Sequence, residues 1–267
     1  MEEVLEWLDV AAEFGFKTVQ PVFFWANYTE EDFNILEKGL ALHRLSAPVL
    51  GVYSDLLKWD RPTGAVFEST IQDLFTAASC AYRLNARYLA TWCGTMGEYG
   101  TPCAENSKME TRQRFKAHQQ KLLPMLEEHA LTLLFEPWRD HVLADEFQTA
   151  EACRLDPDRF GVVLDPPNFI SPAQWPRRCV RVREIVNALQ PHIRMAHLKD
   201  IALDKEGQVE LPMFGSGQLS GEIAKALRPY VGQIPIIAEH LETRNDVPAL
   251  LDAVARSFYG KSRESFA

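Results

Sequence analysis

The chain has 267 residues, of which 46% are apolar, and its formal net charge at pH 7 is −9. So acidic a chain is a poor candidate for coating a phosphate backbone, and no apolar run approaches the roughly 18 residues that a membrane span needs. Five scattered cysteines without a CxxC pair are typical of reduced thiols rather than of a disulfide framework. We therefore expect a soluble cytoplasmic protein.

Helix-like and strand-like segments alternate along the chain. Apolar residues at helical spacing predict the helices, and short continuous apolar runs predict the strands. In chain order the predicted elements are helix 1–16, strand 17–24, helix 29–45, strand 47–53, helix 67–84, strand 86–92, helix 109–130, strand 131–136, helix 143–155, strand 160–165, helix 172–189, strand 193–199, helix 221–231, strand 234–240 and helix 246–260.

This repeated βα pattern predicts an α/β fold with a parallel sheet, because its strands are apolar on both faces. A closed (β/α)8 TIM barrel needs one strand more than the seven predicted here. The first helix begins almost at Met1, so either the sequence starts late, or the barrel lacks its first strand, or the sheet is open. No linker interrupts the pattern, which predicts a single domain over 1–267. No GxGxxG or GxxxxGK[ST] follows a strand, which weighs against a nucleotide-binding open sheet.

Four consecutive predicted strands end in a side chain that can bind a metal: Glu136, Asp165, His197 and Glu239. In a barrel all carboxyl ends of the strands lie on one face, and that face carries the active site. Each residue alone is more often a helix cap or a surface ion pair, but four at successive strand ends predict a metal centre. Three carboxylates and one imidazole favour Mn²⁺ or Mg²⁺, with Co²⁺ or Zn²⁺ as alternatives.

The segments that follow these strands supply candidate substrate-binding residues: Trp138, Arg139, His141, Asn168 and Lys199. Trp138 would stack on the face of a bound ligand, and Arg139 or His141 would hydrogen-bond a hydroxyl or a carboxylate. Arg139 is equally suited to a salt bridge at the rim. Lys199 either adds positive charge near a developing oxyanion or pairs with a nearby acid.

The glycine-rich segment 213–222 comes before a predicted helix. Its backbone N–H groups could bind a phosphate or a sugar hydroxyl. The alternative is a turn in which Ser220 caps the helix. Asp200 is expected to orient a neighbour rather than to react.

Other side chains near strand ends are weaker candidates. Those that would form pocket walls, or merely pack, are Trp25, Tyr53, Trp92 and Glu98. Those expected at the surface are His43, His118, His129 and His192. His240 follows Glu239, and the alternation of a strand points it the other way.

The motifs LFEPW, VLDPPN, AHLKD, FGSGQLSGEIAKAL and IIAEHL, in this order and spacing, resemble the xylose isomerase-like barrels. More closely, they are similar to the sugar phosphate isomerase/epimerase group. That family holds a divalent metal by Glu, Asp, His and Glu on successive strands, which the resemblance assigns to the four residues above. In its ketose epimerases the two glutamates are also acid and base, which implies catalytic roles for Glu136 and Glu239. Asn168 departs from the histidine of several epimerases, and an asparagine carries no proton.

The resemblance implies a metal-dependent isomerase or epimerase of a sugar, sugar phosphate or inosose. Such an enzyme removes a proton next to a carbonyl, and a divalent cation stabilises the resulting enediolate. A lyase or dehydratase, for example an inosose dehydratase, is the first alternative. An endonuclease IV-like enzyme, which needs more metal-binding histidines and a basic face, and a non-catalytic barrel are further alternatives. We expect a small carbohydrate as partner, no nucleic acid, no membrane, and a homodimer or homotetramer.

Overall fold

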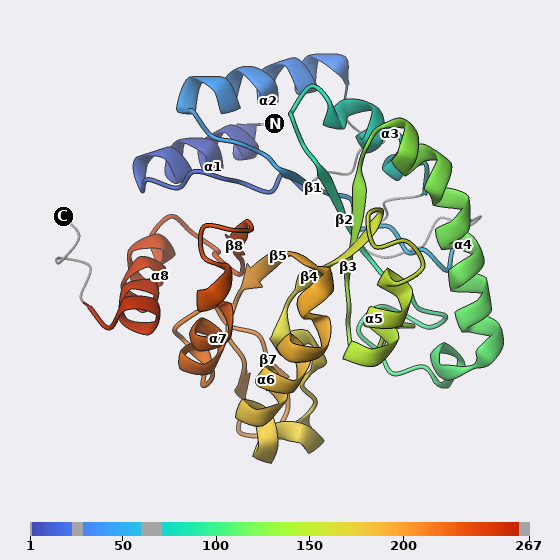
Figure 1. Ribbon diagram of the computed structural model, residues 1–267. Coiled ribbons are helices and arrows are strands. Elements are labelled where there is room, and N and C mark those ends of the chain that lie inside the picture. Colours follow the sequence, from blue (N-terminus) through green and yellow to red (C-terminus); the bar gives the residue numbers. More distant parts are fainter. Residues whose placement is uncertain (1, 23–28, 60–70, 262–267) are drawn as a thin grey trace. The chain divides into compact units, whose positions relative to one another are not determined.

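The computed structural model describes residues 2–22, 29–59 and 71–261. The chain packs as two compact units, Met1–Val162 and Val163–Ala267. Figure 1 labels their helices and strands. Within the described residues, no helix is long and apolar enough to cross a membrane.

The first unit contains parallel strands that alternate with helices along the chain. Its helices are α1 (Glu2–Glu13), α2 (Glu30–His43), α3 (Ile71–Ala81), η2 (Ala104–Ser107), α4 (Met109–Glu128) and α5 (Glu146–Cys153). Its strands are β1 (Val49–Gly51), β2 (Tyr88–Trp92), β3 (Thr132–Glu136) and the start of β4 (Phe160–Leu164). Neighbouring strands pair in parallel, with Val49 opposite Tyr88, Trp92 opposite Glu136 and Leu133 opposite Phe160. The strands are buried almost throughout, as the sequence predicted for strands covered on both faces.

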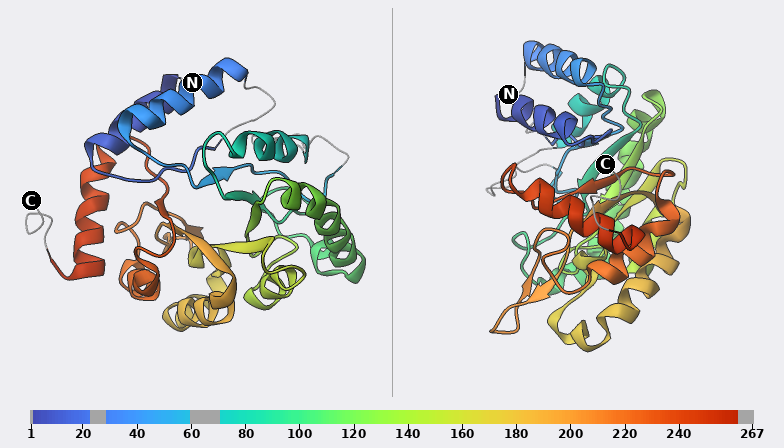
Figure 2. Two further views of the ribbon diagram at one scale, coloured as in Figure 1. Left: turned by 45° about the horizontal axis from the view of Figure 1, so that its top comes forward. Right: turned by 90° about the vertical axis from the view of Figure 1, so that its left-hand side faces the viewer.

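The start of α2 shows how local sequence defines an element. Thr29 accepts a hydrogen bond from the Asp32 N–H, and the Asp32 carboxylate accepts the Thr29 N–H at 2.8 Å, which completes a capping box. These bonds hold the pKa of Asp32 below its usual value. In Figure 2, α1 and α2 lie side by side.

The predicted strand 17–24 is wrong in its extent. Only isolated parallel bridges form there, from Thr18 to Ser46 and from Val22 to Gly51, and positions 23 and 24 lie outside the described residues. Pro21 lies between the two bridges and has no N–H to donate to a ladder, although its carbonyl accepts the Gly51 N–H at 2.8 Å. The predicted start of the third helix, residues 67–70, also lies outside the described part.

The second unit continues the alternation. Its helices are η3 (Pro166–Phe169), η4 (Pro172–Arg177), α6 (Arg178–Leu189), η5 (Gln190–His192), α7 (Ser220–Leu227), η6 (Arg228–Tyr230), α8 (Asp246–Val254) and the π-helix η7 (Ala255–Tyr259). Its strands, after the end of β4, are β5 (Ile193–Leu198), β6 (Ala202–Leu203), β7 (Val209–Glu210) and β8 (Ile236–Ala238). Strands β5 and β8 pair in parallel, with His197 opposite Ile237. The antiparallel hairpin β6–β7 was not predicted, because two-residue strands carry no periodic signal.

The parallel strands follow one another in the order β1-β2-β3-β4-β5-β8, with helices in the intervening sequence. This confirms the predicted repeating βα architecture. The predicted helix 172–189 begins as the 3₁₀ segment η4, and Pro176 lies at the junction with α6. A proline there cannot donate the N–H that a continuous α-helix would need.

Candidate metal centre

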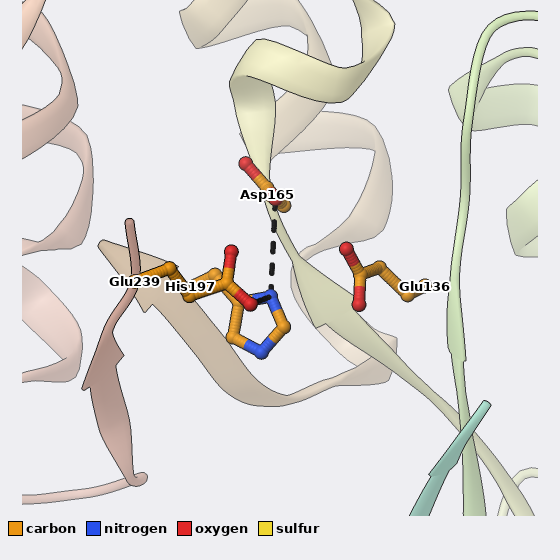
Figure 3. A group of neighbouring side chains, drawn as sticks. All are labelled: Glu136, Asp165, His197 and Glu239. Atoms are coloured by element: carbon orange, nitrogen blue, oxygen red, sulfur yellow. Dashed lines mark ion pairs between the residues drawn. The ribbon is translucent and has the colours of Figure 1, made fainter. Parts of the chain in front are cut away.

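Three of the predicted metal ligands lie together in the second unit, each at the carboxyl end of a strand. Asp165 directly follows β4, His197 lies in β5, and Glu239 directly follows β8. The Glu239 N–H donates to the Leu198 carbonyl at 3.2 Å, which brings Glu239 next to the end of β5. Figure 3 shows the three side chains pointing toward one another.

The distances among these side chains are those of a compact ligand set. The His197 Nδ1 atom lies 3.0 Å from the Glu239 Oε1 atom and 3.8 Å from the Asp165 Oδ2 atom. One ligand atom from each of the three residues lies within 4.8 Å of the others. Asp165 and His197 are fully buried, whereas 25% of the Glu239 side chain is exposed. Burial alone would raise the pKa of Glu239. The positive groups of the neighbouring His197 and Lys199 outweigh this effect, so the pKa lies well below its usual value.

These residues fit a divalent metal ion. Both carboxylate oxygens of Asp165 are buried. Among the described residues, Oδ2 pairs with His197 and Lys199, whereas Oδ1 has neither a hydrogen bond nor an ion pair. A buried carboxylate oxygen without a hydrogen-bond donor is costly unless a cation binds it. Two carboxylates and one imidazole are a donor set that Mn²⁺, Mg²⁺ or Zn²⁺ accepts.

Lys199 lies against the same carboxylates. Its Nζ atom is 2.5 Å from the Asp165 Oδ2 atom and 3.2 Å from the Glu239 Oε2 atom, and only 3% of the residue is exposed. Of the two roles considered for Lys199, the structure therefore shows pairing with nearby acids.

Asp200 organises the glycine-rich segment. Its buried carboxylate accepts the N–H groups of Ile201 and Leu219, both at 2.8 Å, and of Gly215 at 3.2 Å. A Cβ atom on Gly217 would lie 2.6 Å from the Asp200 Cγ atom, so only glycine fits there. Two N–H groups considered for binding phosphate are thus bound to Asp200, as expected of a residue that orients its neighbours.

The prediction that Ser220 caps the following helix is wrong. Ser220 is the first residue of α7 rather than its N-cap, and the N-cap, Leu219, makes no capping hydrogen bond through its side chain. The Asp200 carboxylate, 19 positions earlier in the chain, accepts the Leu219 N–H at the start of the helix instead.

Glu136, the remaining predicted ligand, belongs to the first unit. It ends β3 opposite Trp92, it is 7% exposed, and its backbone carbonyl accepts the Cys93 thiol at 3.5 Å. Figure 3 labels it with the other three residues of the predicted set.

The segment after Glu136 carries buried polar atoms with no hydrogen-bond partner among the described residues. They are the Trp138 Nε1 atom, the Arg139 Nη1 atom and both ring nitrogens of His141. The Arg139 guanidinium lies over the Trp138 ring at 4.6 Å, and its closest carboxylate, that of Asp140, is 3.8 Å away. Burial lowers the pKa of His141 to about 4, so its ring is neutral at pH 7. These three side chains retain hydrogen-bonding capacity that a ligand could use.

Tyr99, which was not among the predicted site residues, joins the aromatic residues of the first unit. Its ring stacks on Trp92 at 4.1 Å and lies 5.1 Å from the His141 ring. Tyr53, a predicted wall residue, lies 5.2 Å from Trp92. Tyr99 carries no strand-end signal, because it follows β2 by seven positions. Of the other predicted walls, Glu98 is exposed and Trp25 lies outside the described residues.

A polar network that was also missed fixes the loop after β2. The Asn106 side chain donates to the Thr95 hydroxyl at 2.8 Å and to the Asp140 carbonyl at 2.6 Å, and accepts the Met96 N–H at 2.8 Å. It therefore ties the loop after β2 to the loop after β3. Amide side chains of this kind are common in loops, so the sequence offered no specific signal.

Asn168 and three of the predicted histidines lie outside the cluster of Asp165, His197 and Glu239. Asn168 is buried in η3, and its backbone N–H donates to the Asp165 carbonyl at 3.1 Å. The expectation that His118 and His192 are surface groups is wrong, because both are buried, and the His118 Nδ1 atom lies 2.6 Å from the Leu56 carbonyl oxygen. His240 is exposed and adopts a positive φ of 58°, so it does not continue β8.

Comparison with known proteins identifies the family. The sequence profile of the xylose isomerase-like TIM barrel family matches residues 8–255. The chain belongs to this family. The predicted resemblance and the TIM-barrel fold class are thereby confirmed. No functionally curated protein matches this xylose isomerase-like chain significantly.

Solved structures similar to this family member share its fold at low sequence identity. A xylose isomerase domain protein from Planctomyces limnophilus has a TM-score of 0.70 at 14% identity, with 95% of this chain and 94% of that chain covered. A xylose isomerase-like TIM barrel protein from Mycobacterium smegmatis in complex with magnesium has a TM-score of 0.64 at 13% identity, with 96% and 89% covered. The 3-keto-D-glucoside 4-epimerase YcjR from E. coli has a TM-score of 0.67 at 11% identity, with 96% and 94% covered.

Proposed function

We propose that the protein is an isomerase or epimerase that uses one divalent metal ion to act on a small polyhydroxy carbonyl compound. The observation that carries this proposal is the cluster of Asp165, His197 and Glu239 at the carboxyl ends of β4, β5 and β8. The fold that the chain shares with a magnesium-containing barrel and with a sugar epimerase supports it.

The ligands would be Asp165, His197 and Glu239, with Glu136 at the end of β3 as the fourth. This assignment gives the order Glu, Asp, His, Glu along successive parallel strands. Mn²⁺ or Mg²⁺ suits three carboxylates and one imidazole best, and Co²⁺ or Zn²⁺ are alternatives. When bound, such an ion polarises a carbonyl oxygen and makes a neighbouring C–H group more acidic.

Glu239 is suited to take a proton from carbon. Its carboxylate is partly exposed, whereas Asp165 is fully buried, and its lowered pKa keeps it ionised at neutral pH. A base must be ionised and within reach of the substrate. Glu136 would be the second acid or base, returning a proton to the opposite face of the same carbon in an epimerase or to the neighbouring position in an isomerase.

The polar groups after β3 would bind the substrate. Trp138 and Arg139 offer N–H donors, and the neutral His141 ring offers one donor and one acceptor. Hydroxyl, carbonyl or carboxylate oxygens of a sugar derivative would satisfy them. Asn168 would contribute an amide group, whereas the ammonium of Lys199 is engaged by Asp165 and Glu239.

Solvent isotope exchange tests the proposal. Wild-type protein and Glu239→Gln would be incubated with Mn²⁺ in D₂O together with ketoses, ketose phosphates or inososes, and followed by NMR. We expect deuterium next to the carbonyl of at least one compound, with the rate at least about 100-fold lower in the variant. Exchange that proceeds equally in both proteins would contradict the role of Glu239. A product that has lost water would replace the isomerase assignment with a dehydratase.

The single-domain organisation, the homodimer or homotetramer and the cytoplasmic location stay predictions. Size-exclusion chromatography with light scattering would test the association state directly.

A further inference from the structure

Lys199 is a buried lysine that contacts two carboxylates of the candidate metal centre. It directly follows β5, and since side chains two positions apart in a strand point to the same side, it shares a face with His197. It is 3% exposed, and its Nζ atom lies between the carboxylates of Asp165 and Glu239, at 2.5 and 3.2 Å. Two of the proposed metal ligands therefore share one ammonium group.

The backbone that carries Lys199 is fixed from both sides. Lys199 forms an antiparallel bridge with Met213, and the Asp200 N–H donates to the Pro212 carbonyl at 2.9 Å. The Asp200 carboxylate, which accepts three further N–H groups, holds the following turn. The ammonium group therefore reaches the carboxylates from a constrained segment rather than from a flexible loop.

The charges around Lys199 require a cation. Asp165 is fully buried and Glu239 largely so, and their carboxylates lie close to the same imidazole. Two ionised carboxylates held this close repel each other unless a positive group lies between them. Lys199 supplies that group through its ammonium: its Nζ atom lies within 4 Å of both carboxylates, while the His197 ring lies against the same two side chains.

We propose that Lys199 is the built-in counter-ion of the metal centre: it holds Asp165 and Glu239 together before the metal binds, and it competes with the metal for them. This inference rests on the proposed function, since it takes these carboxylates to be metal ligands. A divalent ion on the Asp165 Oδ2 atom must either displace the Nζ atom from its 2.5 Å contact or bind against its charge. The folded site thus exists without metal, and Lys199 sets how tightly the metal binds.

Two measurements on one set of variants test this. Lys199→Met removes the charge and keeps most of the side-chain volume, Lys199→Gln is a polar second choice, and Lys199→Arg keeps the charge. Lys225→Met on the exposed face of α7 is the matched control for the loss of one positive charge. Thermal unfolding would be recorded in EDTA, and Mn²⁺ binding would be measured by isothermal titration calorimetry.

We expect Lys199→Met and Lys199→Gln to lower the melting temperature in EDTA by about 5 °C or more. We expect the same variants to bind Mn²⁺ at least about tenfold more tightly than wild type, whereas Lys199→Arg and Lys225→Met bind it as wild type does. Saturating Mn²⁺ should therefore raise the melting temperature of Lys199→Met more than that of wild type.

The opposite outcomes separate this inference from the proposed function. Equal or weaker Mn²⁺ binding by Lys199→Met and Lys199→Gln, in the presence of clear binding by wild type, would overturn the competition while leaving the metal centre intact. An unchanged melting temperature in EDTA would overturn the role as counter-ion. Failure of wild type and all variants to bind Mn²⁺, Mg²⁺, Co²⁺ or Zn²⁺ would overturn the proposed function and the competition with it.

Discussion

Replacing Asp200 by asparagine should destabilise the protein more than a typical loop substitution. The carboxylate is fully buried and accepts three backbone N–H groups, two at Oδ1 and one at Oδ2. Asparagine has one carbonyl oxygen, which can keep the bonds to Ile201 and Leu219, but its NH₂ group must then face the Gly215 N–H. The variant loses one charge-assisted hydrogen bond and leaves buried donors without an acceptor.

The magnitude follows from these losses. A hydrogen bond to a charged group contributes about 1.5–3 kcal/mol, and an unsatisfied buried donor costs about 1–3 kcal/mol. We expect Asp200→Asn to lower the free energy of unfolding by about 3 kcal/mol, measured by urea denaturation followed by circular dichroism. Asp204→Asn is the matched control, because Asp204 lies four positions on, in the β6–β7 turn, and accepts one side-chain hydrogen bond, from the Gln208 N–H, at a partly exposed position. Equal stability of the two variants would refute the reasoning.

Three further substitutions test other parts of the structure. Thr29→Ala removes the capping box of α2 and should lower the free energy of unfolding by about 1 kcal/mol in urea denaturation. Gly217→Ala should lower the free energy of unfolding by about 2 kcal/mol, because the new Cβ atom would clash with Asp200 and the Ile201 carbonyl. Gly221→Ala at the start of α7 is its control: the new Cβ atom has no neighbour within 4 Å, and the free energy of unfolding should not fall. His141 has a pKa of about 4 in the folded protein and about 6.5 unfolded, so the unfolded state binds the extra proton and stability falls as the pH drops from 6.5 toward 4. Protonation of His141 should account for about 2 kcal/mol of the fall in the free energy of unfolding between pH 7.5 and 5, measured by urea denaturation at each pH. His141→Gln should remove this contribution to the pH dependence, and His129→Gln should leave it unchanged.

Much of the fold could be predicted because long periodic segments dominate it. The apolar runs before Glu136, Asp165 and His197 became β3, β4 and β5, and the helices between them lie close to the predicted ranges. Local interruptions were harder to foresee. Pro21 and Pro176 break a strand and a helix at points where periodicity alone predicts continuation, and the hairpin β6–β7 is too short to show any period.

The strand-end positions of the candidate ligands could be predicted from the sequence, but the surroundings of these residues could not. Asp165 and Glu239 directly follow strands and His197 is the second-last residue of β5, so topology alone brings them to one edge. The pairing of Lys199 with two carboxylates depends on a separation of 34 positions to Asp165 and 40 to Glu239, which sequence spacing does not reveal. The burial of His118 likewise depends on packing against the distant Leu56 carbonyl.

The central claim is that a divalent ion binds to the four strand-end residues. Equilibrium dialysis against Mn²⁺, with metal counted by mass spectrometry, would compare wild type with Glu136→Gln and His197→Gln, and with Glu206→Gln in the exposed hairpin loop as control. We expect about one ion per chain for wild type and the control, and an affinity at least about 100-fold weaker for the other two variants. Wild-type protein that binds no divalent ion, or Glu136→Gln and His197→Gln variants that bind it as wild type does, would contradict a metal centre at these residues.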